Sequence, residues 1–360
     1  MRPTKNRFEG IQVLRTLLFI AIVAFHCGLK GSSIFWGGIE IFFVISAFFF
    51  TKRIINSDYK PFLEIRHRIA RLYPIYIVCL IFCLFYIFLV ENIFGIKDFI
   101  IHLLFSQNIN WMVTDYKSEL VNLTAHTWTL SIEIYCFILY VFAFKVFKSN
   151  KARIVFNIVA IFCAICWRTV LTLTVGDEII TSVCPLAHLD AFAIGSLLAL
   201  LETSSVRKKH KDIILGTALL LGMTIIVSCI LITARIKEIS FIKAFDSYKS
   251  SENYFNNAFT SNLYIGFSLI GVGLLYFFKK NHFHNCLFKP LVVCGNISYS
   301  AYLIHYPICR ILLEFVSNRL MIFACTFVLT LMISFLLELG VTCLKTLMKK
   351  FRGEVNDTAV

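Results

Sequence analysis

The chain has 360 residues, of which 58% are hydrophobic and only 16% are charged. A soluble globular protein carries roughly a quarter of its residues as charged side chains, so this composition excludes that class, and it also excludes a disordered chain. The 37 phenylalanines and 14 tyrosines point the same way. We therefore expect an integral membrane protein.

The apolar runs are long enough to cross a bilayer as helices, which takes about 20 residues each. They are continuous and do not alternate, so the strands of a barrel are excluded. The ten predicted spans, in chain order, are 11–29, 34–50, 73–94, 127–147, 154–175, 186–202, 212–234, 259–278, 291–316 and 320–344. The shorter run 98–110 is expected to lie at an interface or to dip back, and the polar insert 235–258 to form an outer loop.

The basic residues predict the orientation of the chain. With the N-terminus in the cytoplasm, 24 of the 35 Lys and Arg residues fall in inside segments and 8 in outside segments. This bias predicts that both termini are cytoplasmic, and it explains the net charge of +14 without a nucleic-acid partner. We expect an all-α fold with about ten transmembrane helices, a single membrane domain over 1–350 and a short cytoplasmic tail over 351–360.

Most of the 13 cysteines lie in apolar runs, where cysteine packs as a small hydrophobic residue. Cys163 and Cys166 form a CxxC motif, but no His or second Cys pair lies near them in the sequence. We expect neither disulfides nor a metal site from this pattern.

Ionisable groups inside apolar runs are functional candidates, because each costs about 3 kcal/mol or more at mid-membrane. Arg15 and His26 are eleven residues apart in the first span, which is almost three helical turns. Their side chains should therefore face the same way, about 16 Å apart along the axis. In the alternative, Arg15 reaches to the membrane surface and His26 caps the helix.

A second basic group precedes the third span on the cytosolic side. Arg68 and Arg71 are three residues apart in RHRIARLYP and share one helical face. Two guanidinium groups in this arrangement suit phosphate oxygens. Alternatively, they belong only to the positively charged inner loops.

Acidic residues and histidines lie toward the outer half of the spans. Glu40 and Ser46 occur in the second span, and Glu40 is too short to reach the membrane surface, so it needs a partner. His126 and Glu133 are two turns apart at the start of the fourth span, where they could orient each other or form a structural pair.

Two further polar candidates are Asp190, near the sixth span, and His305, in the ninth. His305 shares a helical face with Ser298 and Tyr302. The candidates thus divide by depth, with arginines at the cytosolic end and histidines and carboxylates nearer the outer face. This polarity suits transfer of an activated group from a phosphorylated cytosolic donor to an acceptor across the bilayer. A transporter or flippase for a lipid-linked sugar or small anion fits the composition equally well, and a structural partner of a polysaccharide synthase is a third reading.

The motifs that contain these residues occur in an order that is similar to the acyltransferase 3 family of integral-membrane acyltransferases. The resemblance covers about residues 8 to 344. It rests on the Arg15–His26 spacing and on the strings GGIEIFFVISAFFF, RIARLYP, HTWTLSIEIY, DAFAIGSLLA and ISYSAYLIHYPI.

The resemblance implies a multi-pass protein of the bacterial inner membrane that moves an acyl group, most often acetyl, from cytoplasmic coenzyme A. Its acceptor is a hydroxyl of a surface glycan such as O-antigen, lipopolysaccharide, exopolysaccharide or peptidoglycan, in free or lipid-linked form. Acyl-CoA is a co-substrate, no cofactor is bound, and polysaccharide-assembly proteins are possible partners.

Carried over by position, His26 matches the catalytic histidine, Arg15 its partner, Arg68 and Arg71 the donor-binding pair, and Glu133 the acidic residue of the fourth span. We expect His26 to act as a general base or as an acyl carrier, oriented by Glu133 or Glu40.

Some positions depart from the family pattern. Ala47 stands where the family commonly has Gly, Ile134 where a second acid often follows Glu133, and Leu189 where an Arg often precedes Asp190. No SGNH esterase-like domain is expected after the tenth span.

Overall fold

The computed structural model describes the chain in seven ranges. Every regular element within them is a helix, which confirms the all-α prediction. The described residues are 9–55, 57–92, 95–113, 118–175, 178–246, 263–281 and 286–351.

Ten helices are long. They are α1 (Glu9–His26), α2 (Gly38–Ile54), α3 (Pro61–Glu91), α7 (Trp128–Val146), α8 (Asn150–Thr174), α10 (Leu189–Thr203), α11 (Lys208–Ile236), α13 (Leu263–Lys280), α15 (Ser298–Phe315) and α16 (Arg319–Phe351). The shorter α-helices are α4 (Ile96–Leu103), α5 (Gln107–Val113), α6 (Glu119–Thr124), α9 (Glu178–Val183), α12 (Phe241–Asp246) and α14 (Lys289–Asn296). The 3-10 turns are η2 (Ser33–Gly37), η3 (Ala125–Thr127), η4 (Pro185–His188) and η6 (Cys286–Phe288).

Within the described ranges, nine helices are long and apolar enough to cross a membrane. The ten long helices follow the ten predicted runs in order, but the prediction of one helix over 291–316 is wrong. The chain breaks at Ile297, between α14 and α15, and the polar residues of α15 lower its hydropathy. The cytoplasmic placement of the termini stays a prediction.

Close packing against α1 explains the break. The Thr16 hydroxyl donates to the Leu291 carbonyl over 2.6 Å. Gly295 lies against the backbone of Gln12, so near that any side chain there would collide with it. The short helix α14 is thus held across the side of α1, and the chain must turn before α15 begins.

The run 98–110 forms two short helices, α4 and α5, neither of which is long enough to cross. Phe105 turns the chain between them in a left-handed conformation (φ 54°) and stacks on Tyr76 at 5.3 Å. His102 of α4 is buried, with Nδ1 2.8 Å from the Asp98 carbonyl oxygen, and burial lowers the pKa of this histidine below its usual 6.5. The predicted outer loop 235–258 contains α12, and residues 247–258 lie outside the described residues.

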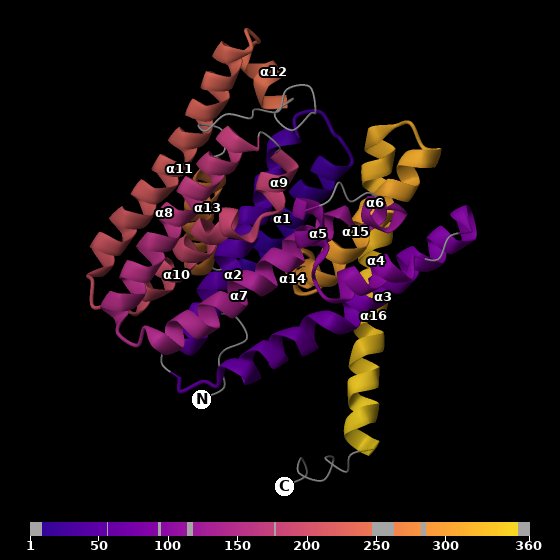
Figure 1. The fold of residues 1–360 in the computed structure, drawn as a ribbon, viewed down its shortest axis with the longest axis horizontal. Coiled ribbons are helices and arrows are strands. Elements are labelled where there is room, and N and C mark those ends of the chain that lie inside the picture. Colours follow the sequence, from indigo (N-terminus) through magenta and orange to yellow (C-terminus); the bar gives the residue numbers. More distant parts are fainter. Residues whose placement is uncertain are drawn as a thin grey trace.

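Helix α3 begins at Pro61, twelve residues before the predicted third span. Proline is favoured in the first turn of a helix because its missing N–H has no partner to lose there. The arginine-containing segment RHRIARLYP therefore continues directly into the apolar segment, across Pro74. In Figure 1, α3 runs obliquely below the bundle, with Arg68 and Arg71 two to three turns from its start.

The interior is divided into two main hydrophobic clusters, which we call the first and second clusters. The first contains buried residues of α1, α2, α7, α8, α10 and α13, among them Ile22, Phe48, Ile132, Tyr140 and Phe192. The second contains residues of α3, α6, α7 and α15, among them Tyr76, Leu80, Leu130, Ile134 and Ile304. Figure 1 shows α8, α10, α11 and α13 on one side of the molecule and α3 and α16 on the other.

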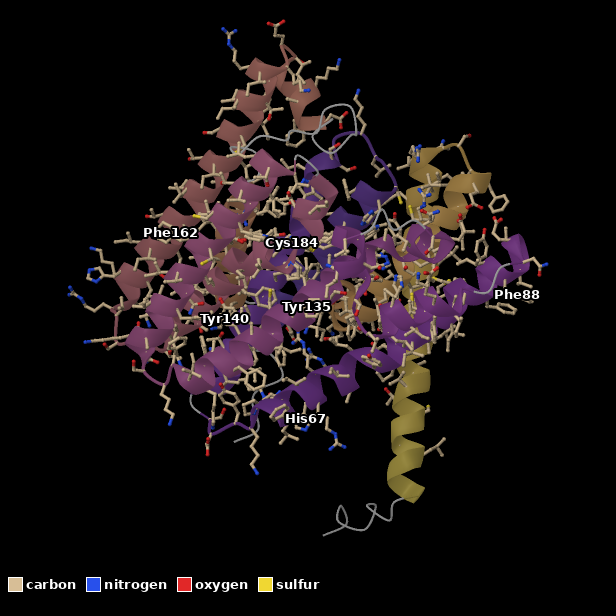
Figure 2. All side chains as sticks on the ribbon, viewed as in Figure 1. His67, Phe88, Tyr135, Tyr140, Phe162 and Cys184 are labelled. Atoms are coloured by element: carbon tan, nitrogen blue, oxygen red, sulfur yellow. The ribbon has the colours of Figure 1, made fainter. Side chains whose placement is uncertain are left out.

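Large apolar side chains cover the outside of the molecule, as expected for a surface in contact with lipid. Figure 2 shows Phe162 on α8 and Phe88 near the end of α3 directed outward, and they are 63% and 47% exposed. Cys163 and Cys166 are exposed on α8. Across the described residues, no group of three His, Cys, Asp or Glu side chains is arranged to hold a metal ion.

Candidate active site

A cavity of about 710 Å³ lies between the two clusters, walled by α1, α2, α3, α7, α14, α15 and α16. Volumes of this order are typical of small-molecule sites. Its charged lining consists of four arginines and three glutamates: Arg15, Arg53, Arg68, Arg71, Glu64, Glu133 and Glu338. Arginines and acids from five different helices thus meet in one space.

Helix α7 places Glu133 at the boundary of the clusters. Leu130 and Ile134 pack into the second cluster, whereas Ile132 and Cys136 pack into the first. Glu133 lies between these two apolar faces and lines the cavity. The apolar pattern of the helix therefore determines where its carboxylate points.

Glu133 is the centre of a three-residue polar contact. The Ser46 hydroxyl donates to Glu133 Oε1 over 2.6 Å, and Arg68 donates to the Ser46 oxygen over 2.7 Å. Arg68 also forms an ion pair with Glu133, and its guanidinium lies 5.1 Å from the centre of the Phe137 ring. These contacts join α2, α3 and α7 and neutralise the charge of Arg68.

Arg15 and Arg71 line the same cavity, but their guanidinium groups are not paired as that of Arg68 is. In the part of the chain that the structure describes, no hydrogen bond or ion pair joins either guanidinium to another residue. Arg53, in the last turn of α2, is instead paired at 2.9 Å with Glu64, in the first turn of α3. Two arginines that face a cavity without an acidic partner form a site for an anion, and guanidinium groups suit phosphate oxygens.

His26 does not line this cavity. It ends α1 and packs against His305 and Tyr306, with ring centres 5.2 and 4.7 Å away. Tyr302, one turn earlier on α15, lines the cavity and packs on His126 at 5.3 Å. His26, His126 and His305 therefore lie outside the cavity lining. Tyr302 lines the cavity and also contacts the rings of His126 and His305.

Pro307 helps to hold His126 in this place. Because proline has no N–H, the Leu303 carbonyl lacks its usual donor four residues along the helix. That oxygen accepts instead from His126 Nε2 over 3.1 Å and from the Cys79 thiol over 3.2 Å. Glu133, two turns after His126, is held by Ser46 and Arg68, so the structure does not show the His126–Glu133 pair considered above.

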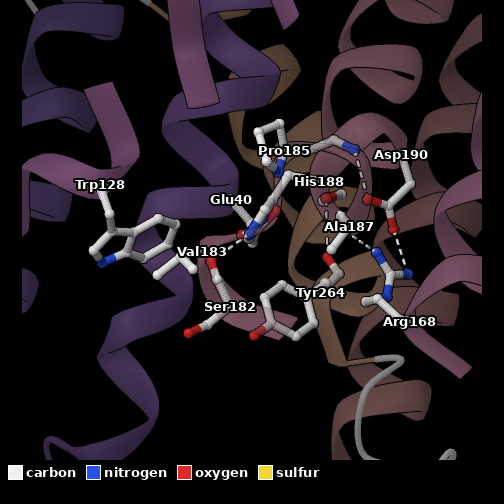
Figure 3. Close-up of polar contacts among 12 residues, drawn as sticks. Glu40, Trp128, Arg168, Ser182, Val183, Pro185, Ala187, His188, Asp190 and Tyr264 are labelled. Atoms are coloured by element: carbon white, nitrogen blue, oxygen red, sulfur yellow. Dashed lines mark hydrogen bonds and ion pairs between the residues drawn. The ribbon is translucent and has the colours of Figure 1, made fainter. Parts of the chain in front are cut away.

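The expectation that Glu40 orients His26 is wrong. Glu40 is fully buried and pairs with His188, whose Nδ1 lies 2.8 Å from Oε1 (Figure 3). The other His188 nitrogen donates to the Ser182 carbonyl over 2.8 Å. Glu133 is paired with Arg68, so neither carboxylate orients His26 as expected.

Asp190 belongs to a second buried pair beside the first. Arg168 Nη2 donates to Asp190 Oδ2 over 2.7 Å, and both side chains are fully buried. Tyr264 packs between the two pairs, 5.3 Å from the Arg168 guanidinium and 5.1 Å from the His188 ring (Figure 3). Asp190 therefore links α8 to α10 and does not line the cavity.

Sequence analysis missed Arg168 and His188 of the buried pairs, and Arg53, Glu64 and Glu338 of the cavity lining. Arg168 could have been found, because a buried arginine in an apolar run requires an acidic partner and Asp190 was the nearest candidate in such a run. Glu338 lines the cavity and accepts a hydrogen bond from Ser300, but it lies in the last span, where no motif pointed to it.

Comparison with known proteins identifies the family. The sequence profile of a family described as an acyltransferase domain matches residues 8–339. The chain belongs to this acyltransferase family. The matched range contains every residue that lines the cavity except Val341, and it also contains His26, His126 and His305.

The chain is similar to the O-acetyltransferase OatA of Staphylococcus aureus, in strains NCTC 8325, COL and MRSA252. Each is 23% identical over 323 residues, which cover 83% of this chain and 50% of the relative. The chain thus spans about half the length of these relatives. No solved structure matches the chain closely.

Proposed function

We propose that the chain is a membrane O-acyltransferase of the bacterial inner membrane that takes acetyl from acetyl-CoA and passes it to a glycan hydroxyl. O-antigen, exopolysaccharide and lipid-linked precursors are the acceptor classes. The observation that carries the proposal is the cavity, which holds Arg15 and Arg71 without acidic partners inside an acyltransferase domain. The relatives named as O-acetyltransferases support it.

The chemistry of the donor fits the cavity. Acetyl-CoA carries a pyrophosphate and a further phosphate at one end and a thioester on a long, flexible arm at the other. Arg15 and Arg71 would hold the phosphates, and Arg68 is fixed beside them by Glu133. The arm would then extend along the cavity toward Tyr302, which places the thioester near the histidines.

The reaction needs a base because a sugar hydroxyl is a weak nucleophile. The hydroxyl oxygen attacks the thioester carbonyl carbon, a C–O bond forms, and the C–S bond breaks. His26 takes the hydroxyl proton and returns it to the leaving sulfur, which departs as the free thiol. General-base assistance of this kind contributes about 10² to 10⁴ in rate. In the second version, His26 itself accepts the acetyl group and passes it on.

Donor binding is tested with the purified protein in lipid nanodiscs, labelled acetyl-CoA and a surface-glycan acceptor. Arg71→Ala should raise the KM for acetyl-CoA about tenfold, which corresponds to the loss of about 1.4 kcal/mol. Arg66→Ala is the matched control, because Arg66 is exposed on the same helix and does not line the cavity. Equal KM values for the two variants would show that the donor binds elsewhere.

The same assay tests the role of His26. His26→Ala should abolish acetyl transfer in both versions of the mechanism, and wild-type transfer by this variant would rule both out. Transfer of label without net movement of the acceptor across the bilayer separates an acyltransferase from a transporter or flippase. Acceptor supply by polysaccharide-assembly proteins belongs to the same proposal.

A further inference from the structure

A helix begins at the edge of the cavity, inside the apolar run that the sequence predicts as the ninth span. The chain turns at Ile297, between α14 and α15, and the residues on either side of the turn, Asn296 and Ser298, both line the cavity. A helix start at membrane depth is tolerated where it is buried in protein or borders a cavity. In membrane transporters such starts face anionic groups of the substrate.

The first backbone N–H groups of α15 have no acceptor within the chain. An α-helix leaves these groups without an intrahelical carbonyl, and a polar side chain just before the first turn usually accepts from one of them. Here that position holds Ile297, which makes no side-chain cap hydrogen bond. Over the described ranges, no carbonyl accepts from the backbone N–H of Ser298, Tyr299 or Ser300. The start of α15 therefore presents several donors and the positive end of the helix dipole.

The side chain of Ser298 is directed into the cavity. Ser298 is only 3% exposed, and it lines the cavity together with Tyr302, one turn further along the same face of α15. In the described part of the chain, no hydrogen bond joins its hydroxyl, or the amide of Asn296, to another residue. Buried polar groups are nearly always hydrogen-bonded, so an unpartnered hydroxyl in a cavity wall indicates a ligand.

Arg15 of α1 brings a positive charge to the same side of the cavity. Gly295 lies against the backbone of Gln12, so the turn before α15 enters the cavity directly beside α1. Arg15 follows Gln12 by three residues on one face of α1, and both line the cavity. The Nε atom of Arg15 is buried and has no hydrogen-bond partner among the described residues.

The charges of the cavity lining favour an anion. Arg53 is paired with Glu64 and Arg68 with Glu133, so these four charges balance. The remaining charged lining residues are two arginines and one acid: Arg15, Arg71 and Glu338. Glu338 accepts from the hydroxyl of Ser300, which does not itself line the cavity. One positive charge is left over for a ligand.

We propose that the start of α15 is a phosphate subsite, formed by its first N–H groups, the Ser298 hydroxyl and the Asn296 amide, with Arg15 as its charged partner. Helix N-termini bind phosphate through their backbone N–H groups and the helix dipole, and a guanidinium adds charge-assisted hydrogen bonds. The inference rests on the proposed function: it assigns one phosphate of the acyl-CoA donor to α15 and Arg15, and leaves Arg71 for another. The diphosphate of a lipid-linked acceptor has the same chemistry.

Two variants of equal size test the subsite in the acetyl-transfer assay. Ser298→Asp places a carboxylate where the phosphate is expected, whereas Ser298→Asn is neutral and keeps a hydrogen-bond donor. Because two negative charges at this distance repel, the KM for acetyl-CoA should be about 100-fold higher in Ser298→Asp than in Ser298→Asn. Acetyl-pantetheine has the thioester and the arm but no phosphate, so its KM should be equal in both. Asn296→Asp, compared with wild type, repeats the test without a change in size.

The results distinguish the source of the phosphate. A charge effect on the KM of a lipid-diphosphate acceptor, with none on acetyl-CoA, would support the subsite and assign it to the acceptor. A KM difference that persists with acetyl-pantetheine would overturn the subsite, since that donor has no phosphate to lose. Thermal unfolding of each ligand-free variant reports whether the fold is intact.

Pyrophosphate alone separates the subsite from the proposed function. In nanodiscs without donor or acceptor, it should raise the unfolding midpoint of the wild type and of Ser298→Asn, but not that of Ser298→Asp. If it does so while the wild type transfers no acetyl group, the subsite stands and the proposed function fails. If the wild type transfers acetyl and the two variants share one KM for acetyl-CoA and for the acceptor, only the subsite fails.

Discussion

At the scale of single residues, the interior contains two ion pairs that water does not reach. Arg168–Asp190 and His188–Glu40 lie side by side around Tyr264, and all four ionisable side chains are fully buried. A buried pair contributes little net stability relative to apolar packing, but removing one partner leaves a costly uncompensated charge.

Asp190→Ala should therefore lower the free energy of unfolding by about 3–5 kcal/mol. The double variant Arg168→Met with Asp190→Leu removes both charges and keeps apolar volume, so it should recover most of that loss. The unfolding midpoint in detergent micelles measures both. If the single and double variants unfold at the same temperature, the guanidinium is not the origin of the cost.

Some of these residues could be predicted from the sequence and others could not. Arg15, Arg68, Arg71 and Glu133 line one cavity, in keeping with their spacing along the helices and with the family motifs. The partner of Glu40 could not be derived, because His188 is 148 positions away and only the packing of α2 against η4 and α10 brings it near. Periodicity specifies the face of a helix but not the helix opposite.

At the scale of elements, small residues determine how closely the helices approach. Gly195 of α10 packs onto the backbone of α2, where an added Cβ would collide with the Val44 carbonyl and lie 3.0 Å from the Ala47 Cβ. Membrane helices use such small residues for close contact, since lipid offers no hydrophobic driving force between them. The methyl group of Ala47 is accommodated in this contact because Gly195 faces it.

Gly195→Ala should destabilise the protein by about 1–3 kcal/mol, the usual cost of inserting a methyl group into a well-packed contact. Gly216→Ala on α11 is the matched control, because nothing lies within 4 Å of the added carbon. We expect the control to be neutral or slightly stabilised. Equal thermal unfolding midpoints for the two variants would contradict close packing of α2 and α10.

The sequence predicts the existence of the long helices better than their ends. The apolar runs marked all ten in order, since about 20 apolar residues have few alternatives in a membrane. The ends of α3 and the break before α15 depend on tertiary contacts: the polar start of α3 lines the cavity, and α14 is held against α1 by Thr16 and Gly295. Composition contains no signal for either.

At the scale of the whole molecule, the distribution of Lys and Arg predicts that both termini face the cytoplasm. A fluorescent protein that matures only in the cytoplasm, fused after Val360, should therefore be bright in cells. A periplasmic alkaline phosphatase at the same position should be inactive. The reverse pattern would invert the orientation and place the arginine end of the cavity on the outer side, where no acyl-CoA is available.

The cavity also separates two hydrophobic clusters that share few helices. α7 contributes to both, with Leu130 and Ile134 in one and Ile132 and Cys136 in the other. The interior is therefore least continuous around the cavity. A molecule that fills this cavity would contact both clusters and couple their unfolding, so the liganded protein would unfold as one cooperative unit. Without a ligand, each cluster would open locally and independently of the other.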